Sequence, residues 1–279
     1  MLKQRVITGL VLAVSFLTAL FALSTYGFIA LITVVLAYAA WEWSDLAGLS
    51  NPTARSFYML GLVAIAAALA ATIGFEQNIL LTEAPRFLLL AACTWWAIAV
   101  LWVQSFPSSA ILWGRRWLCL LMGVFVLLPM WLAFAGLMSL AEGPKLVLAV
   151  VLLVALADIG GYFVGRAIGR TKLAPKVSPG KTWEGLLGGQ LAIVLVVGTT
   201  ASFLDLDAGR IGLWLGLAMV TGLASVLGDL LESMVKRQRG VKDSGTILPG
   251  HGGVLDRIDG LTAALPVFSL VLSLLYSRL

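Results

Sequence analysis

The chain has 279 residues, of which 60% are hydrophobic and 12% are charged. Soluble domains typically contain about 45–50% apolar and about 25% charged residues, so this composition excludes an ordinary water-soluble fold. The net charge of +5 lies in short segments between apolar runs. It does not form a groove or a helix face, so we expect no nucleic-acid partner. The composition predicts an integral protein of the lipid bilayer.

The N-terminus carries Lys3 and Arg5, followed by an apolar run over residues 6–23. A signal peptide has an apolar region of about 7–15 residues and a small-residue cleavage site. The run here is longer and has no clear site of that kind. We interpret it as an uncleaved first transmembrane helix.

Further along the chain, the apolar runs approach the length of about 20 residues that a spanning helix needs. The second run is the shortest, and the fifth contains Pro129, which we expect to kink the helix without splitting it. The sequence therefore predicts an all-α, polytopic membrane protein of about nine transmembrane helices, in a single domain over residues 1–279. The runs are 6–23, 27–41, 57–74, 86–103, 117–139, 145–165, 185–204, 211–233 and 260–277.

Lysine and arginine are distributed unequally over the connecting segments. If the N-terminus is inside and nine spans alternate, all but four of the 19 basic residues fall on the inside. This is the positive-inside pattern. It predicts a cytoplasmic N-terminus, an outside C-terminus and, given the short loops, a multi-pass protein of a bacterial inner membrane. The exceptions are Arg86, Lys145, Arg210 and Arg278.

The two halves of the chain differ in composition. Most tryptophans lie in residues 1–140, and most of the 14 acidic residues lie in residues 141–279. Tryptophan is typical of membrane interfaces, so the first half is interpreted as scaffold helices. The second half is expected to carry the catalytic helices and cytoplasmic loops.

Asp158 lies inside the sixth run, near its cytoplasmic end. An ionisable group at membrane depth is costly and therefore a functional candidate. Gly161, Tyr162 and Gly165 follow at i+3, i+4 and i+7, so they share its helix face. Small residues also permit close helix packing, and the glycines fit that role equally well.

The next loop, 166–183, contains five cations and no acidic residue. Ordinary positive-inside charge, attraction to anionic lipid and a shaped anion pocket all fit this pattern. The cations are Arg166, Arg170, Lys172, Lys176 and Lys181.

The eighth run ends with Asp229, Glu232, Ser233 and Lys236, spaced so that they form one stripe along a helix. A glycine-rich cytoplasmic stretch follows, up to Arg257.

Two further acids, Asp256 and Asp259, open the ninth run at i and i+3. Carboxylates at the ends of neighbouring helices can meet at one depth. Hard oxygen ligands beside lysines and arginines suit a complex of Mg²⁺ with a polyphosphate.

The stretch 233–259 reads SMVKRQRGVKDSGTILPGHGGVLDRID. It closely resembles the highly specific signature of the phosphatidate cytidylyltransferases, also called CDP-diacylglycerol synthases. The segment 178–185, SPGKTWEG, resembles a second motif of that family. The resemblance implies that CTP (or dCTP) and phosphatidate react to give CDP-diacylglycerol and pyrophosphate, with Mg²⁺ required.

The resemblance also implies site residues. A metal site is expected at Asp229 and Asp256, with Asp259 as a third carboxylate and room for a second, monovalent or divalent cation. The other expected roles fall into two groups. Catalytic roles fall to Asp229, Asp256, Lys236, Arg237, Lys242, His251 and Arg257, and substrate binding falls to Asp158, Lys172, Ser178, Lys181, Thr182, Glu184, Ser233 and Asp243.

The only histidine, His251, is a candidate general base. A phosphomonoester has a second pKa of about 6, so the lipid nucleophile is already anionic at neutral pH. Such a reaction needs charge neutralisation and alignment more than a strong base. We therefore favour a hydrogen-bonding or positioning role for His251.

Two alternatives belong to other classes. The segment 256–263 matches the opening of the CDP-alcohol phosphatidyltransferase motif, but Ala264 stands where that family continues with arginine. No acidic residue follows Asp259 to complete that motif. A transporter or channel lined by Asp158 and Asp229 would show flux without pyrophosphate release. Acyl-chain preference and oligomeric state, a homodimer included, are left open.

Overall fold

The computed structural model describes residues 2–74 and 78–276, with side chains from residue 6 onward. Arg278, which we predicted to lie outside, falls beyond the described residues. The described chain is predominantly helical, which confirms the predicted all-α class. In chain order the elements are α1 (Leu2–Ala22), α2 (Thr25–Leu46), α3 (Pro52–Ile73), the 3₁₀ turn η1 (Ile79–Leu81), α4 (Glu83–Gln104), α5 (Ala110–Trp113), α6 (Arg116–Met138), α7 (Gly143–Ile168), β1 (Lys172–Ala174), β2 (Ser178–Thr182), α8 (Trp183–Phe203), α9 (Ala208–Arg239) and α10 (Leu255–Leu275).

Within the described residues, 8 helices are long and apolar enough to cross a membrane: α2, α3, α4 and α6 to α10. The remaining predicted span is α1, whose apolar part, Val6–Ala22, is shorter. The run that we predicted to be shortest, 27–41, is instead part of the 22-residue α2. Helix α6 continues through Pro129, as predicted. A polytopic membrane protein is confirmed.

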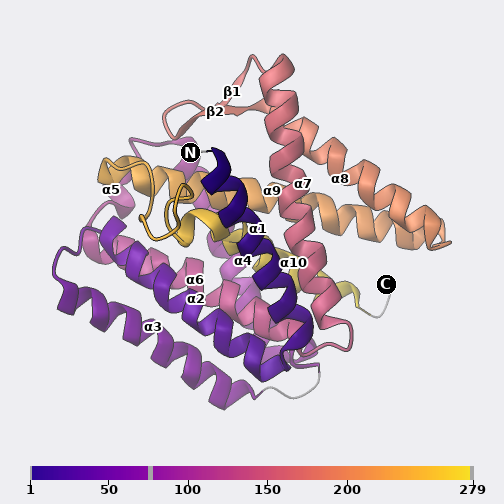
Figure 1. Cartoon of the computed structure of the whole chain (residues 1–279), viewed down its shortest axis with the longest axis horizontal. Helices are drawn as coiled ribbons and strands as arrows, with labels where there is room; N and C mark the ends of the chain where they lie inside the picture. Colours follow the sequence, from indigo (N-terminus) through magenta and orange to yellow (C-terminus); the bar gives the residue numbers. More distant parts are fainter. Residues whose placement is uncertain (1, 75–77, 277–279) are drawn as a thin grey trace.

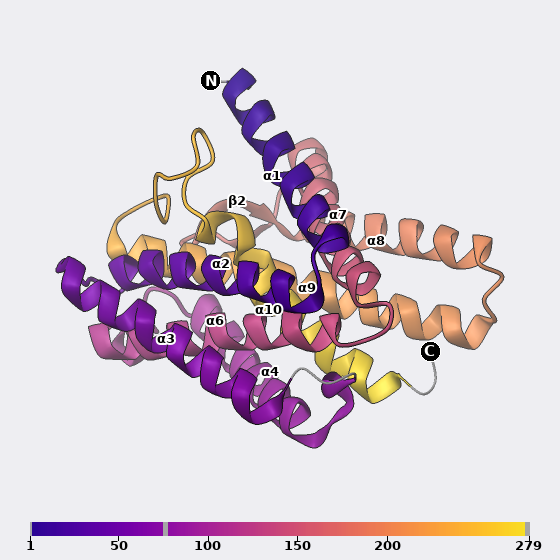
Figure 2. The ribbon, with the colours of Figure 1, turned by 60° about the horizontal axis from the view of Figure 1, so that its bottom comes forward.

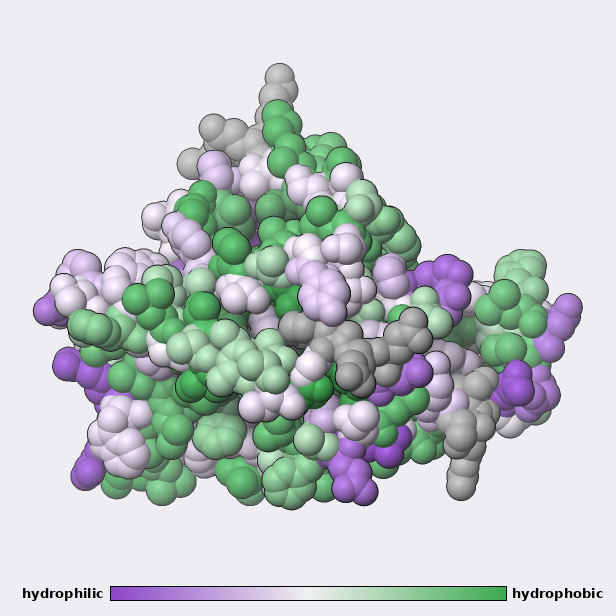
Figure 3. All heavy atoms as spheres, turned by 90° about the horizontal axis from the view of Figure 1, so that it is seen from below, coloured by the Kyte–Doolittle hydropathy of each residue, from purple (hydrophilic) through white to green (hydrophobic). Residues whose placement is uncertain are grey.

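Helix α10 is central to the arrangement (Figure 1) and packs against α9, α6, α4, α7 and α2. Helices α8 and α9 run side by side and extend away from the group formed by α2, α3, α4 and α6 (Figure 2). Seen from below, apolar side chains cover most of the surface and hydrophilic ones lie mostly toward its edges (Figure 3). Such a surface is suited to contact with lipid.

The glycines that follow Asp158 allow α7 and α8 to cross closely. A Cβ atom on Gly185 of α8 would lie 2.8 Å from the carbonyl oxygen of Gly161 and 3.3 Å from the Cα atom of Gly165. Small residues at a helix crossing permit this approach of two backbones. These glycines therefore have the helix-packing role that we considered for them from the sequence.

Contacts between the helix ends separate into two sets. At one end of the bundle, Arg239 Nε donates to the carbonyl oxygen of Asp45 at 3.0 Å. At the other, Asn78 N donates to the carbonyl oxygen of Ser139 at 3.0 Å. The first pair joins segments predicted to lie inside, and the second joins segments predicted to lie outside. This is the pairing that alternating spans require. The side that faces the cytoplasm stays a prediction from the charge distribution.

The loop 166–183 contains an antiparallel hairpin, β1 with β2, which the helix-only prediction did not include. An isolated two-stranded hairpin is only marginally stable in water. Here Ala174 and Val177 are buried, and Arg237 Nε of α9 donates to the carbonyl oxygen of Val177 at 3.2 Å. Packing on α9 thus supports the hairpin.

Single-cysteine labelling tests the orientation. In a variant whose Cys93 and Cys119 are replaced by alanine, Lys176→Cys and Thr246→Cys should react only with reagent supplied from the cytoplasmic side. Arg210→Cys should react only from the outside, because charge places it on the opposite face. Labelling of Thr246→Cys from the outside would contradict the predicted orientation and indicate the opposite one.

Candidate active site

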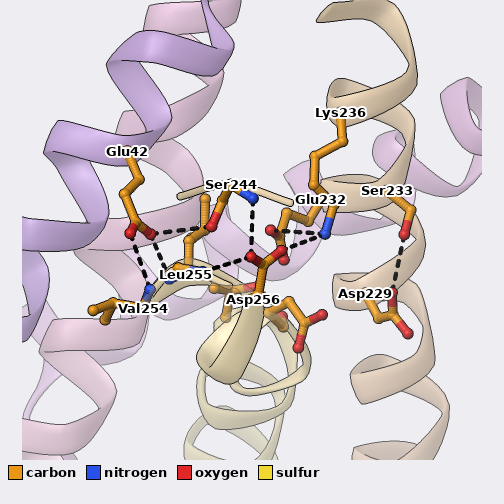
Figure 4. A network of polar contacts seen from close by, with 12 residues as sticks. Glu42, Asp229, Glu232, Ser233, Lys236, Ser244, Val254, Leu255 and Asp256 are labelled. Atoms are coloured by element: carbon orange, nitrogen blue, oxygen red, sulfur yellow. Dashed lines mark hydrogen bonds and ion pairs between the residues drawn. The ribbon is translucent and has the colours of Figure 1, made fainter. Parts of the chain in front are cut away.

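A buried charge cluster joins α9 to α10 (Figure 4). Lys236 Nζ lies 2.6 Å from Asp256 Oδ1 and 3.1 Å from Glu232 Oε1. The Asp256 and Glu232 side chains are only 6% and 3% exposed. Lys236 and Glu232 are one turn apart on α9, and Asp256 lies in the first turn of α10. One ammonium group therefore faces two carboxylates.

Asp229 lies lower on α9, apart from Asp256 (Figure 4). Its Oδ2 is 2.6 Å from Lys181 Nζ of β2, and its Oδ1 accepts a hydrogen bond from Ser233 Oγ at 3.1 Å. Both members of the ion pair are partly exposed. This pair fastens the basic hairpin to the acidic stripe of α9.

A cavity of about 350 Å³ lies between α7, the hairpin, α8 and α9; we call it the hairpin cavity. Asp158, Gly161, Tyr162 and Gly165 all line it, which confirms that they share one face. Its wall combines cationic groups with apolar side chains. The lining also includes Arg166, Leu173, Ser178, Lys181, Thr182, Leu186 and Val226.

A second cavity of about 550 Å³ lies inside the loop between α9 and α10; we call it the loop cavity. Gly250 and Gly252 have positive φ values of 75° and 79°, which glycine adopts without strain. They form the turn that carries His251. The predicted site residues on its wall are Lys242, Asp243, His251 and Arg257.

The other predicted site residues are not among those that line the two cavities. Glu184 accepts two hydrogen bonds from Thr171 N at 3.1 and 3.2 Å. Lys172 is exposed on β1. Arg237 contacts the hairpin backbone, and Ser233 contacts Asp229. In this structure Glu184 and Arg237 hold the hairpin in place.

In the described part of the chain the acidic residues do not form a closed metal site. Among the described residues, no three His, Cys, Asp or Glu side chains come together as a group that could hold a metal ion, so Asp229, Asp256 and Asp259 are not assembled as one set. Glu232 Oε2 is buried and has no hydrogen-bond partner in the described part of the chain. Mg²⁺ is typically held by one or two carboxylates together with substrate phosphates. The oxygen donors fit an ion that arrives with such a substrate.

Glu42 contacts the loop of the candidate site, and we did not predict it from the sequence. It lies in α2, is 3% exposed, and contacts Ser244, Val254 and Leu255. A signal was present, because an acid between Trp41 and Trp43 at the end of an apolar run is costly unless it is used.

Comparison with known proteins is consistent with this geometry. Residues 3–275 match the Cytidylyltransferase family. The phosphatidate cytidylyltransferase of Pseudomonas aeruginosa is 46% identical over 275 residues, which cover 98% of this chain and 97% of that one. The enzyme of the same name from Haemophilus influenzae is 41% identical, covering 96% and 98%. That of Brucella suis is 54% identical over 107 residues, covering 38% and 39%.

The first two relatives are similar over nearly their whole length, and the family match includes both charge clusters and both cavities. The resemblance inferred from the two motifs is therefore confirmed: this chain belongs to the cytidylyltransferase family.

Proposed function

We propose that this chain is a phosphatidate cytidylyltransferase. It would make CDP-diacylglycerol and pyrophosphate from CTP, or dCTP, and phosphatidate at the cytoplasmic face of a bacterial inner membrane, in phospholipid biosynthesis. The observation that carries the proposal is the pair of cavities beside the α9–α10 acids. One cavity has a partly apolar wall and the other is polar, as one lipid and one soluble nucleotide require.

The hairpin cavity suits the lipid substrate. Leu173, Leu186 and Val226 give it apolar wall, and the neighbouring surfaces of α7 and α8 are apolar and exposed. Lys181 and Arg166 supply positive charge on the same wall. A phosphate on a diacylglycerol could therefore meet cations while its acyl chains stay in the bilayer.

The loop cavity suits the nucleotide. Lys242 and Arg257 supply cations, and His251 supplies a hydrogen-bonding group. Gly250 and Gly252 give this loop a tight turn in which the backbone lacks side chains and a phosphate can approach closely.

In the proposed reaction, a phosphate oxygen of phosphatidate attacks the α-phosphorus of CTP. A new P–O bond forms, the bond from that phosphorus to the oxygen bridging to the β-phosphate breaks, and pyrophosphate leaves with the electron pair. The nucleophile is already anionic. The residues would therefore mainly align the two phosphates and compensate their charge. His251 would hold a substrate or the loop in position and would not act as a general base.

We also propose that Mg²⁺ binds together with the nucleotide phosphates and that Asp229 and Asp256 are its protein ligands. When bound, it would neutralise charge on the phosphates. Lys181 and Lys236 now contact these carboxylates, so they would turn toward phosphate oxygens when the ion binds.

A second cation and a homodimer stay predictions. The family match favours neither the CDP-alcohol phosphatidyltransferase nor the transporter reading.

Pyrophosphate release tests the proposed function directly. Purified protein in phosphatidate-containing vesicles should release pyrophosphate from CTP in the presence of Mg²⁺. Vesicles with diacylglycerol in place of phosphatidate lack the nucleophile and should give none. Lipid-independent release, or none with any phosphatidate, would contradict the proposal.

Loss of either proposed ligand should abolish turnover. Asp229→Asn and Asp256→Asn each remove a charged oxygen donor, so the rate should fall by about 10²–10³-fold or more. Asp205→Asn, far away on the connection from α8 to α9, is the matched control and should keep wild-type activity. If either site variant retained more than about a tenth of the rate, that residue would not be an essential ligand.

The hairpin offers a matched pair of lysines. Lys181→Ala removes the cation that contacts Asp229 on the cavity wall, so kcat/KM for phosphatidate should fall about 10-fold or more. Lys172→Ala, nine residues earlier and exposed on β1, should have a much smaller effect. Equal losses, measured at equal amounts of folded protein, would mean that only the overall positive charge of the hairpin matters.

A further inference from the structure

The loop that carries the nucleotide-side residues has little packing of its own. On one side lies the loop cavity. On the other lies a hollow of about 820 Å³ between residues 241–247 and the ends of α2 and α3, walled by Trp41, Asp45 and Arg55 among others. Most side chains in 237–247 are exposed, whereas Ser244 is buried. A segment between two hollows keeps one conformation only if specific contacts hold it.

Glu42 supplies three of those contacts (Figure 4), and Asp256 supplies two more by accepting from Ser244 N and Gly253 N. Its Oε2 accepts hydrogen bonds from Ser244 Oγ at 3.1 Å and Leu255 N at 2.8 Å. Its Oε1 accepts one from Val254 N at 3.0 Å. Hydrogen bonds to a carboxylate are about twice as strong as neutral ones. One side chain of α2 thus holds the loop near its middle and at its end.

Glu42 also completes the start of α10. The first turn of a helix leaves N–H groups without partners and carries partial positive charge. Val254, the residue before α10, has no side chain that can cap them. Glu42 accepts from Val254 N and Leu255 N from outside the helix. The next residue is Asp256, so the cap fixes the turn from which that carboxylate projects.

Two glycines of the motif make room for this carboxylate. A Cβ atom on Gly253 would lie 2.6 Å from Glu42 Oε2, and a Cβ atom on Gly245 would lie 3.1 Å from its carboxyl carbon. Both distances are too short for ordinary contacts. Glycine at these positions allows the backbone to close around Glu42.

We infer that Glu42 is a positioning residue for the reaction: it holds the 241–254 loop and the α10 N-terminus so that the nucleotide-side groups and Asp256 face the substrates. The inference rests on the proposed function. It assigns a role in the site to a residue from the half of the chain expected to be scaffold.

Steady-state kinetics of Glu42→Gln test the inference. The amide keeps the shape but places an NH₂ group against an N–H donor or a hydroxyl, so the loop should loosen. The KM for CTP should rise about 10–100-fold, as for other residues that orient a site, while the KM for phosphatidate should change little. Ser244→Ala removes one of three contacts and should give a smaller rise, and Glu42→Asp an intermediate one. Glu83→Gln, exposed at the start of α4, is the control.

A second measurement does not need turnover. In the background lacking Cys93 and Cys119, labelling of Thr246→Cys should become faster when Glu42→Gln is added. Unchanged KM for CTP and an unchanged labelling rate would overturn the inference while leaving the proposed function intact. A lower apparent kcat with both KM values and the labelling rate unchanged would mean only that less of the protein is folded, and it would also overturn the positioning role. An inactive wild type would refute the proposed function, and labelling would still decide whether Glu42 holds the loop.

Discussion

Charge buried at the membrane boundary is stable only where opposite charge or hydrogen bonds compensate it. In this protein the compensation centres on Lys236, which lies between Asp256 and Glu232 at the contact of α9 and α10. Removing one partner of a buried ion pair typically costs about 3–5 kcal/mol. The alignment of these two helices is therefore strongly determined, and the features around the site depend on it. Asp229 on the same stripe reaches the hairpin, and Asp256 reaches the loop.

The same carboxylates connect pieces that are far apart in the chain. Asp256 Oδ2 accepts from Ser244 N at 2.9 Å and Gly253 N at 2.8 Å, and Glu42 contacts the same loop from α2. Backbone N–H and hydroxyl groups of one loop thus donate hydrogen bonds to two carboxylates, Asp256 of α10 and Glu42 of α2. The loop is exposed to water, yet these contacts restrict it where it approaches the acids of α9 and α10. Such restriction is what alignment of two phosphate groups requires.

The position of the site also reflects the two substrates that we propose. Acyl chains are stable only in the bilayer, and a nucleoside triphosphate is stable only in water, so the reaction has to occur where the two phases meet. The cavities lie at the ends of α7 to α10, where apolar helix surfaces give way to basic loops. Cavity walls that carry lysine and arginine suit this boundary, because both reactants and both products are anionic.

The sequence by itself determined the fold class, the approximate spans and the family. Membrane helices show directly as long apolar runs because all of their backbone hydrogen bonds are local, and the motif over residues 233–259 is contiguous enough to recognise. The tertiary structure alone decided which of these residues meet. The hairpin of 172–182 and the pairing of Lys181 with Asp229 depend on packing against α9. Glu42 joins a loop more than two hundred residues away, and no local pattern encodes that contact. Burial was the decisive factor, because a carboxylate that is only 3% exposed must find its hydrogen-bond partners wherever the fold brings them.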